Sequence, residues 1–312
     1  MIERLGTHIG PRDLIAESLQ QKRSKNTRAA YEKDLRYFFS AVCGHPPTPE
    51  VVKEFLNLDA RDAVALVSSY RATLIDRDLK EATVNRRLAA IKDLVRYATK
   101  VGKCEWNLAS ITGEKVKSYR DTTGIEPEAF KQMMLLCDRA TVKGKRDYAL
   151  LRLLWENALR RGEVSALNIG DFDVDSRRLW ILGKGRGSQK EAIAISTPLI
   201  QALSDWLAVR CELTPFQPLF VSIAHLTYGH RLSGTSIYRI VRELAAMAGI
   251  KKTISPHRIR HSGITAALVV TGGDVRRVQK LSRHSNLNTL MIYDDNRLNH
   301  QSEISEILSE LI

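Results

Sequence analysis

A polar, basic segment interrupts the hydrophobic pattern of this chain between Ser110 and Gly124. It reads SITGEKVKSYRDTTG, and its few apolar residues follow no regular period. Segments of this kind connect folded units rather than forming part of a core. The chain has 312 residues, which is more than one compact domain usually needs. We therefore expect two domains, over residues 1–110 and 125–312, joined by a linker over residues 111–124.

The residues before the linker carry apolar side chains at helical spacing. The stretch SKNTRAAYEKDLRYFFSAV has them at Ala30, Tyr31, Leu35, Phe38 and Phe39. Asn26 or Thr27 is the candidate N-cap of this helix. The stretch TVNRRLAAIKDLVRYATKVG repeats the spacing from Val84 to Ala98. This periodicity predicts a helical N-terminal domain.

Both helical stretches also carry basic side chains that the apolar stripe does not use. Lys25 and Arg28 in the first stretch, and Arg86 and Arg87 in the second, are candidates for contact with DNA phosphates. A merely solvated basic face fits the same pattern. The net charge of +13 and the pI near 9.7 favour a polyanionic partner such as nucleic acid over a merely soluble basic protein.

The residues after the linker are also mainly helical in pattern, with one change of period. Two β-prone runs, Leu179–Leu182 and Ala192–Ile195, flank a glycine-rich turn, which indicates a β-hairpin. Lys184 lies in that turn, and the turn lacks the spacing of a phosphate-binding P-loop. Taken alone, Lys184 is most simply an exposed hairpin lysine. We expect a mainly helical second domain with a small antiparallel sheet.

Several sequence features exclude other classes of protein. The four cysteines are scattered and form no C-x-x-C pair, which argues against a disulfide framework and a structural zinc site. No apolar run approaches the length of a membrane span, and the start MIERLGTHIGPRD lacks a signal-peptide core. We expect a cytoplasmic protein that is not associated with a membrane and uses no metal ion or cofactor.

Two motifs in the second domain could act on a phosphate. In SPHRIRHSG, His257 and Arg260 are three residues apart and would share one helix face. A guanidinium offers two donors to a phosphate, and an imidazole donates or shuttles a proton. In ENALRRGEVSAL, Arg160 or Arg161 lies just before Glu163. Each motif alone also fits an ordinary helix.

A third motif lies near the C-terminus, where His284 precedes Tyr293 by nine residues. Tyrosine has a pKa of about 10, so it acts as a nucleophile only when it is activated and its transition state is stabilised. Arginine, histidine and lysine side chains could supply both for attack on a phosphodiester, and no metal ion would then be required.

Taken in chain order, these motifs resemble those of the tyrosine recombinase, or phage integrase, family. The resemblance lies in ALRRGEV, GKG, SPHRIRHSGITAAL and LSRHSNLNTLMIY, together with the two N-terminal helical stretches, and it covers nearly the whole chain. It implies a mainly α, two-domain protein. A helical SAM-like core-binding domain would be followed by an α+β catalytic domain with a small antiparallel sheet, the DNA breaking–rejoining fold.

The resemblance also implies a role for each matching residue around the scissile phosphate. Arg160 and Arg260 would hold the phosphate. His257 would assist proton transfer, and His284 would donate a hydrogen bond to a phosphate oxygen. Arg161 remains open as an alternative to Arg160, because the two arginines are adjacent.

The resemblance implies that two further residues carry out the covalent chemistry. Tyr293 would attack and become a 3′-phosphotyrosine, and Lys184 would be the general acid toward the departing 5′ oxygen. Glu163 and His261 would orient the cations. The protein–DNA link conserves the bond energy in this family, so neither ATP nor metal would be needed.

Some positions depart from the family pattern. Ala158 stands where the first box usually has glycine, and Arg283 stands where glycine commonly precedes the final histidine. Arg283 could add a DNA phosphate contact. Two aspartates at 294–295 follow the tyrosine, and nearby anions disfavour a phenolate. These acids either weaken the nucleophile, face away from it or bind a neighbour.

The last twelve residues, QSEISEILSELI, place their apolar side chains on one stripe. A helix this short is marginal alone. It packs on its own domain or, as the resemblance implies, docks on an adjacent protomer as an exchange helix over about residues 301–312. We expect a site-specific recombinase or integrase that acts as a tetramer on double-stranded DNA sites. The alternatives are a type IB topoisomerase-like nicking-closing enzyme and a non-catalytic DNA-binding protein.

Overall fold

The computed structural model describes residues 13–116, 124–183, 189–211, 213–298 and 300–311, and it describes no side chains for residues 294–303. The chain divides into two compact units, residues 1–118 and 119–312. Each unit has its own hydrophobic core.

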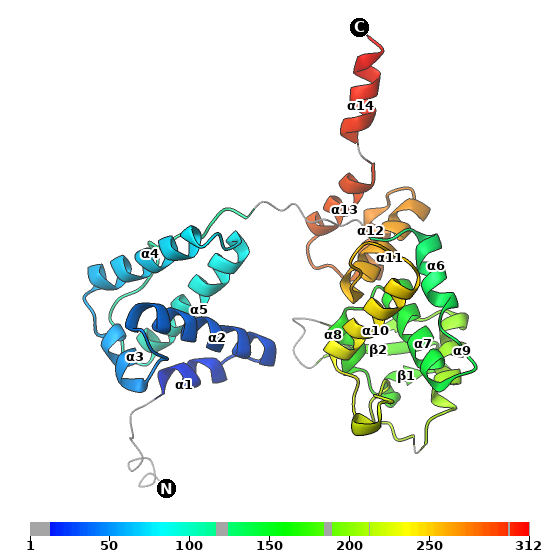
Figure 1. The fold of residues 1–312 in the computed structure, drawn as a ribbon, viewed down its shortest axis with the longest axis horizontal. Helices are drawn as coiled ribbons and strands as arrows, with labels where there is room; N and C mark the ends of the chain where they lie inside the picture. The colour runs from blue at the N-terminus through cyan, green and yellow to red at the C-terminus, as the bar shows by residue number, and fades with distance from the viewer. Residues whose placement is uncertain (1–12, 117–123, 184–188, 212, 299, 312) are drawn as a thin grey trace. The chain divides into compact units, whose positions relative to one another are not determined.

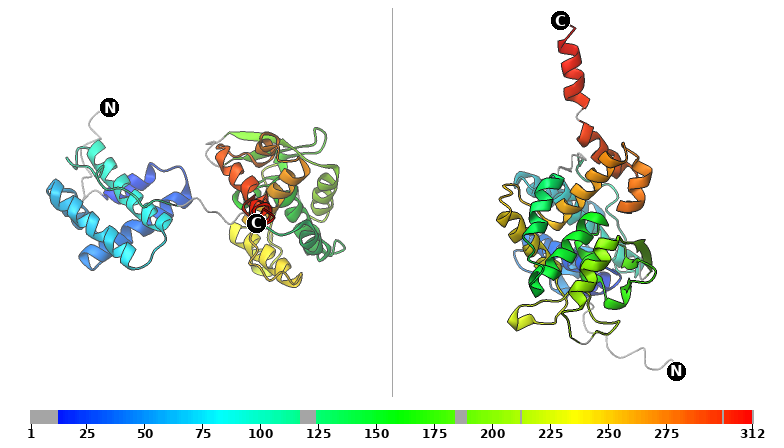
Figure 2. Two further views of the ribbon diagram at one scale, coloured as in Figure 1. Left: turned by 90° about the horizontal axis from the view of Figure 1, so that it is seen from above. Right: turned by 90° about the vertical axis from the view of Figure 1, so that its right-hand side faces the viewer.

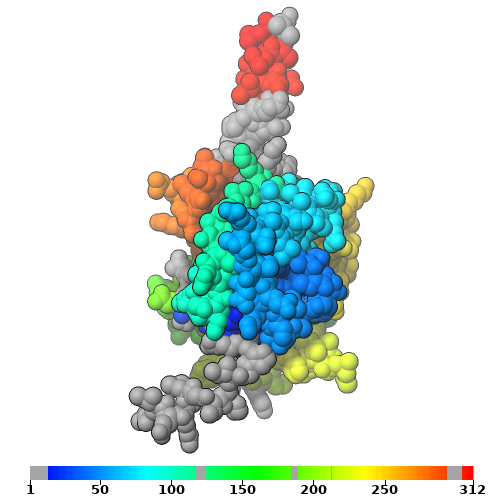
Figure 3. Space-filling model, turned by 90° about the vertical axis from the view of Figure 1, so that its left-hand side faces the viewer, coloured from blue at the N-terminus to red at the C-terminus, as the bar shows by residue number. Residues whose placement is uncertain are grey.

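The described part of the first unit is built from helices alone (Figure 1). They are α1 (Leu14–Gln20), α2 (Lys25–Cys43), α3 (Pro49–Leu56), α4 (Ala60–Asp76) and α5 (Glu81–Lys100). Helices α2, α4 and α5 pack against one another, and α1 lies on α2 and α5. Figure 3 shows one face of this unit, where the segments from α3 to the end of α5 lie together.

Helix α2 begins at Lys25 because Ser24 caps it. The Ser24 hydroxyl accepts a hydrogen bond from the backbone N–H of Thr27 at 3.3 Å. The prediction that Asn26 or Thr27 is the N-cap is therefore wrong. The helix ends at Cys43 and is capped by Gly44, whose φ of 79° lies in the left-handed region that favours glycine.

Aromatic rings form the centre of this core. The Phe38 ring lies edge-on to Phe55 and Tyr70, with centroid distances of 5.2 and 5.1 Å. Phe55 meets Trp106 in the same way at 5.4 Å. Edge-to-face pairs of this kind stabilise a core beyond the burial of their area. Because Trp106 follows the last helix, its contact fastens the chain after α5 to the bundle.

The second unit is mainly helical and contains one small sheet (Figures 1 and 2). Its helices are α6 (Pro127–Leu135), α7 (Val142–Glu156), α8 (Arg161–Ala166), α9 (Thr197–Leu207), α10 (Gly234–Met247), α11 (Pro256–Val270), α12 (Val275–Ser282), α13 (Asn288–Leu298) and α14 (His300–Ser309). Two short 3-10 helices, η1 (Ile169–Asp171) and η2 (His225–Thr227), lie in the connections.

The sheet has the strands β1 (Phe172–Asp173), β2 (Arg178–Leu182) and β3 (Lys190–Ala194), antiparallel and in that order. Leu179 and Ile181 of β2 are fully buried, while Arg178, Trp180 and Leu182, which alternate with them, are exposed. This alternation explains why the sequence indicates a hairpin here. The predicted hairpin is confirmed, with strand ends one or two residues from those expected, and β1 adds a short third strand.

Helix α7 occupies the centre of this unit. It packs on α9 and α11, and its leucines belong to the main core. Gly263 lets α11 come close, because a Cβ atom at this position would lie 2.4 Å from the carbonyl oxygen of Trp155. The contact between α7 and α11 brings the chain after α7 beside the first turns of α11.

A second, smaller cluster joins α11, α12 and α13. Its buried members are Ala158, Ile264, Leu268, Val278, Leu290 and Tyr293. The cluster docks α13 on α11 and α12, which in turn places Tyr293 beside α11. The observed architecture confirms the predicted fold class, a helical first unit followed by a mainly helical unit with a small antiparallel sheet. Across the described ranges, no helix is both long and apolar enough to cross a bilayer.

Candidate functional site

The first turns of α11 carry three of the predicted site residues. Ser255 caps the helix by accepting a hydrogen bond from the N–H of Arg258, and this sets the helical register of the residues that follow. His257 and His261 lie one turn apart, with ring centroids separated by 4.1 Å. Arg260 is fully buried between the helix and its neighbours. A single helix face therefore presents two imidazoles and one guanidinium.

Two later segments meet this face. The ring of Tyr293 on α13 lies 4.9 Å from the ring of His261 and 6.0 Å from that of His284. The Nε2 atom of His284 lies 3.4 Å from Nη2 of Arg260. Tyr293 itself is only 2% exposed. The structure thus brings the histidine–arginine motif and the histidine–tyrosine motif together.

The buried guanidinium of Arg260 ties three segments to one another. It donates hydrogen bonds to the carbonyl oxygens of Ala158 and Ser282. Its Nε–H is buried and has no acceptor among the described residues. Burial lowers the pKa of Arg260 to about 9, and the charges of Arg160 and Arg283 add to this effect. The side chain stays protonated at neutral pH and keeps one donor available for an anion.

Arg160 reaches the site from the start of α8. Its guanidinium and its backbone N–H both donate to the carboxylate of Glu163, each at 2.8 Å. Burial alone would raise the pKa of Glu163, but hydrogen bonds from Arg160 and the charge of Arg283 lower it. Arg161 is exposed and lies beside Gly234 instead. Of the two adjacent arginines, Arg160 is therefore the one that joins this network.

Arg283 lies inside the site although its position follows a helix end. Its side chain is 8% exposed and donates to Glu163 at 3.1 Å and to the carbonyl of Asn157 at 3.0 Å. It also forms an ion pair with Glu191 on β3 at 3.6 Å. The phosphate contact expected of Arg283 has no support in this arrangement. Nothing in the sequence pattern marks Glu191 as a neighbour of these residues.

His261 is a neutral residue in a cationic environment. It is 6% exposed, and burial together with the charges of His257 and Arg260 lowers its pKa to about 3. Its Nδ1 atom is buried without a hydrogen-bond partner in the described part of the chain. A neutral imidazole packed against Tyr293 can accept a hydrogen bond without adding positive charge.

Two groups of predicted residues lie beyond what the structure describes. Lys184 is outside the described residues, although the strands β2 and β3 on either side of its turn are described. The side chains of the aspartates at 294–295 are outside them as well. The expectations for these residues remain predictions.

The four basic residues predicted to bind DNA from the first unit differ in their surroundings. Lys25 and Arg28 are exposed. Arg86 and Arg87 form ion pairs with the buried Asp34, at 2.5 and 3.9 Å. Burial raises the pKa of the Asp34 carboxyl, and the two arginines oppose this rise.

Arg87 is the more enclosed member of the Asp34 pair. Its side chain is 15% exposed, against 43% for Arg86, and its guanidinium lies 4.5 Å from the centroid of the Tyr37 ring. A cation stacked on an aromatic ring and paired with a buried acid stabilises the helical bundle. Arg86 retains more accessible charge than Arg87.

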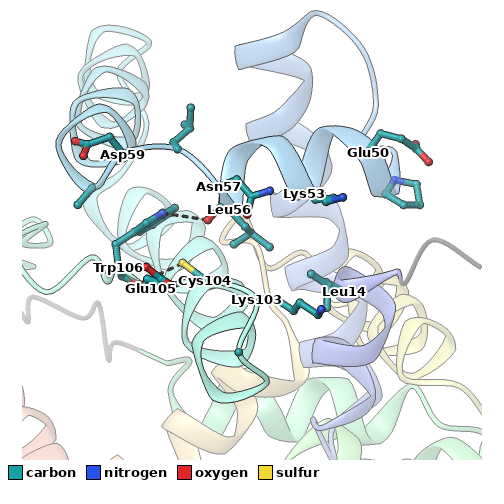
Figure 4. A pocket seen from close by; sticks show the side chains of 14 residues that line it. Leu14, Glu50, Lys53, Leu56, Asn57, Asp59, Lys103, Cys104, Glu105 and Trp106 are labelled. Carbon is teal, nitrogen blue, oxygen red and sulfur yellow. Dashed lines mark hydrogen bonds between the residues drawn. The ribbon is translucent and has the colours of Figure 1, made fainter. Parts of the chain in front are cut away.

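A pocket of about 1210 Å³ lies in the first unit, between α1, α3 and the chain after α5 (Figure 4). Its wall includes Trp106, whose indole N–H donates to the carbonyl of Leu56 at 3.1 Å. None of the predicted site residues lines this pocket. The candidate site is the cluster of charged and ring side chains in the second unit.

Comparison with known families assigns both parts of the chain. Residues 124–300 match the model of the phage integrase family, and residues 16–102 match the phage integrase N-terminal SAM-like domain. The resemblance noted from the motifs is confirmed.

Individual proteins extend this match to nearly the full length. A tyrosine recombinase of Synechocystis is 52% identical over 300 residues, which cover 96% of each chain. A tyrosine recombinase of Synechococcus elongatus is 48% identical over 300 residues. The match covers 96% of this chain and 94% of that protein. The crystal structure of the XerH site-specific recombinase bound to its palindromic difH substrate matches with a TM-score of 0.63 at 19% identity, covering 95% of both chains. At that identity the structural match concerns the fold.

Proposed function

The chain belongs to the phage integrase family of tyrosine recombinases, and on this premise we propose that it cleaves and rejoins double-stranded DNA at specific sites. Cleavage proceeds through a 3′-phosphotyrosine intermediate on Tyr293. Neither a metal ion nor ATP takes part. The proposed mechanism rests on residues of the second unit.

One observation carries the proposal. Tyr293 packs against the imidazoles of His261 and His284, and His284 contacts the buried Arg260. These residues come from α11, α13 and the loop between α12 and α13, so only the folded chain assembles them. A protein that merely bound DNA would have no use for a buried phenol at the centre of such a cluster.

The charges suit attack on a phosphodiester. In the first step, the Tyr293 oxygen forms a bond to phosphorus while the bond from phosphorus to the 5′ oxygen breaks. Negative charge grows on the non-bridging oxygens, where Arg160 and Arg260 neutralise it. The buried Nε–H of Arg260 is a donor already in place for such an oxygen. His284 donates a further hydrogen bond, and His257 assists the transfer of the phenol proton.

The departing 5′ oxygen needs a proton, and we assign this role to Lys184. The second step reverses the first. A 5′ hydroxyl from another strand attacks the phosphotyrosine, the bond to Tyr293 breaks and the phenol regains its proton. No bond energy is lost between the steps, so no nucleotide is consumed.

Assembly and DNA contact form part of the same proposal. Recombination between two duplex sites uses a tetramer, and α14 is the segment that joins neighbouring protomers. Its apolar side chains Ile304, Ile307 and Leu308, and Leu311 just after it, are each more than half exposed. Lys25, Arg28 and Arg86 in the first unit contact DNA phosphates. The order of the domains, a DNA-binding region, a linker over residues 111–124 and a catalytic region, suits a clamp around duplex DNA.

The test is a search for a covalent adduct. Nicked duplexes with a randomised central region are incubated with the protein, and DNA that resists removal by detergent is isolated and sequenced. We expect the wild-type protein to retain a defined set of sequences and the Tyr293→Phe variant to retain none. Absence of any adduct from the wild-type pool would contradict a catalytic role.

The same selected DNA distinguishes the kinds of enzyme. Two differently labelled duplexes are mixed, and strand joining between them is followed. Joined products support recombination, whereas nicking and resealing within one duplex alone would favour a topoisomerase-like enzyme. Deleting residues 301–312 tests the tail. We expect this deletion to leave DNA binding intact and abolish joining between duplexes.

A further inference from the structure

Two residues of the site have an unusual backbone conformation. Ala158 has a φ of 46° and Arg283 has a φ of 56°, both in the left-handed region that favours glycine. Glycine is the residue that the family pattern has at both positions. Arg283 is the informative one of the two, because an arginine there accepts the same backbone strain and adds a long charged side chain.

That side chain connects four parts of the second unit. The guanidinium of Arg283 donates to the carbonyls of Asn157 and Leu281, at 3.0 and 2.9 Å, so it joins the chain after α7 to the end of α12. It donates to Glu163 of α8 at 3.1 Å. Its Nε atom lies 3.6 Å from the Glu191 carboxylate on β3.

The charges alternate along this set of contacts. Arg160 donates to Oε1 of Glu163, while Arg283 donates to Oε2 of the same carboxylate. Glu191 then pairs with the far side of Arg283 and is 21% exposed. A carboxylate held from both sides cannot rotate freely, so the orientation of Arg160 depends on Arg283 as well. The ion pair with Glu191 extends this dependence to strand β3.

We propose that Arg283 is a positioning residue that fastens strand β3, through Glu191, to the Glu163–Arg160 pair of the catalytic site. It acts through Arg160 and touches no DNA. The inference rests on the proposed function, because one of its readouts is DNA cleavage. A direct phosphate contact by Arg283 is the competing interpretation, and its 8% exposure argues against that.

Three substitutions separate the connections of Arg283. Arg283→Gly removes the whole set of contacts and suits the left-handed backbone, so the variant is expected to fold. Glu191→Gln removes only the ion pair to β3. Arg283→Lys keeps a positive charge opposite Glu163 but loses the planar fork that reaches several acceptors at once.

The chain offers a matched control in Arg177→Gly. Arg177 also has a left-handed backbone, with a φ of 53°, but it lies exposed in the turn between β1 and β2. The substitution therefore repeats the loss of an arginine and the relief of backbone strain outside the site. We expect it to leave both cleavage and β3 unchanged.

The first measurement needs no DNA. Amide hydrogen exchange is followed over residues 190–194 in the full-length protein. We expect faster exchange in Arg283→Gly and in Glu191→Gln, and an unchanged rate in Arg177→Gly. Equal exchange in all four proteins would overturn the connection to β3, whatever the protein does to DNA.

The second measurement uses a duplex selected from the randomised pool by covalent trapping. Single-turnover cleavage and DNA affinity are measured separately. We expect Arg283→Gly to slow cleavage by about tenfold to a hundredfold with affinity unchanged within about twofold. Arg283→Lys should recover part of the rate. Glu191→Gln should slow cleavage less and have no further effect in the Arg283→Gly background.

Each result has one meaning. An unchanged cleavage rate in Arg283→Gly, or additive losses in the double variant, would overturn the proposal. A loss confined to DNA affinity would assign Arg283 to phosphate binding instead. If the wild-type protein formed no adduct with any duplex, the proposed function would fail, while the exchange measurement would still decide the connection through Arg283.

Discussion

His261 shows how one residue is adjusted to its place in the site. It packs between His257 and Tyr293, and Arg260 and His284 also lie close to it. A protonated imidazole at this point would repel the neighbouring guanidinium of Arg260, to which we assign phosphate binding. Burial and these neighbours keep His261 neutral, so it packs on the tyrosine ring without adding positive charge.

The depressed pKa of His261 predicts acid lability. The unfolded chain binds a proton at this histidine below a pH of about 6.5, but the folded protein does so only near pH 3. Stability therefore falls as the pH drops through this window, by at most about 1.4 kcal/mol per pH unit. Urea unfolding at about pH 7.5 and about pH 5 measures the loss.

His261→Phe should reduce that pH-dependent loss by about 2 kcal/mol, because phenylalanine binds no proton in either state. His230→Gln is the control for replacing a histidine at an exposed position. An identical pH dependence in wild type and His261→Phe would show that His261 is protonated in the folded protein.

At the scale of elements, the docking of α13 decides where Tyr293, the proposed nucleophile, lies. Leu290 and Tyr293 are three residues apart on one face of this helix, and both are buried against α11 and α12. The adjacent Met291 is 40% exposed. The position of Tyr293 is therefore maintained by apolar packing one turn earlier in the same helix.

Leu290→Ala should release α13 from its cluster. Truncating a fully buried leucine costs about 2–5 kcal/mol, and most of this cost falls on the contacts of α13. We expect faster hydrogen exchange in residues 288–293 and a loss of covalent adduct with DNA affinity retained. Met291→Ala is the neighbouring control. If Leu290→Ala formed adduct at the wild-type rate, docking of α13 would not limit the reaction.

The helices and strands were predictable where the spacing of apolar residues along the sequence determines them. Long amphipathic helices and the alternating strands around Lys184 follow directly from spacing. The N-cap of α2 did not, because Ser24 is one of several capping residues in succession. Strand β1 has two residues, too few to show a period. The pairing of Arg283 with Glu191 joins residues far apart in sequence, so no local pattern contains it.

At the scale of the whole molecule, net charge is a poor guide to the DNA-binding surface. The chain carries a net charge of +13, yet part of its basic side chains neutralise buried acids. Arg86 and Arg87 pair with Asp34, and Lys22 pairs with Asp93. The motifs gave the proposed catalytic residues from the sequence alone, whereas the sorting of arginines into structural and accessible ones required the tertiary structure.

This sorting predicts different effects on salt dependence. Replacing both Lys25 and Arg28 by alanine should weaken DNA binding and reduce the slope of log K against log salt by about 0.9 per lost phosphate contact. Arg87→Ala should change the slope little and instead destabilise the first unit, because it weakens the pairing of the buried Asp34. Fluorescence anisotropy with a duplex selected by covalent trapping measures the salt dependence of binding. Urea unfolding measures the stability of the first unit. The reverse pattern would place Arg87 at the DNA.

Mass spectrometry of the trapped adduct is the most direct test of the mechanism. The adduct is formed without ATP and with a metal chelator present, then digested with nuclease and trypsin. Cleavage after Arg283 and Arg297 yields the peptide HSNLNTLMIYDDNR, whose only tyrosine is Tyr293. The account predicts a 3′-phosphate-linked nucleotide on that tyrosine. A nucleotide on another residue, or an adduct that forms only with metal or ATP, would contradict it.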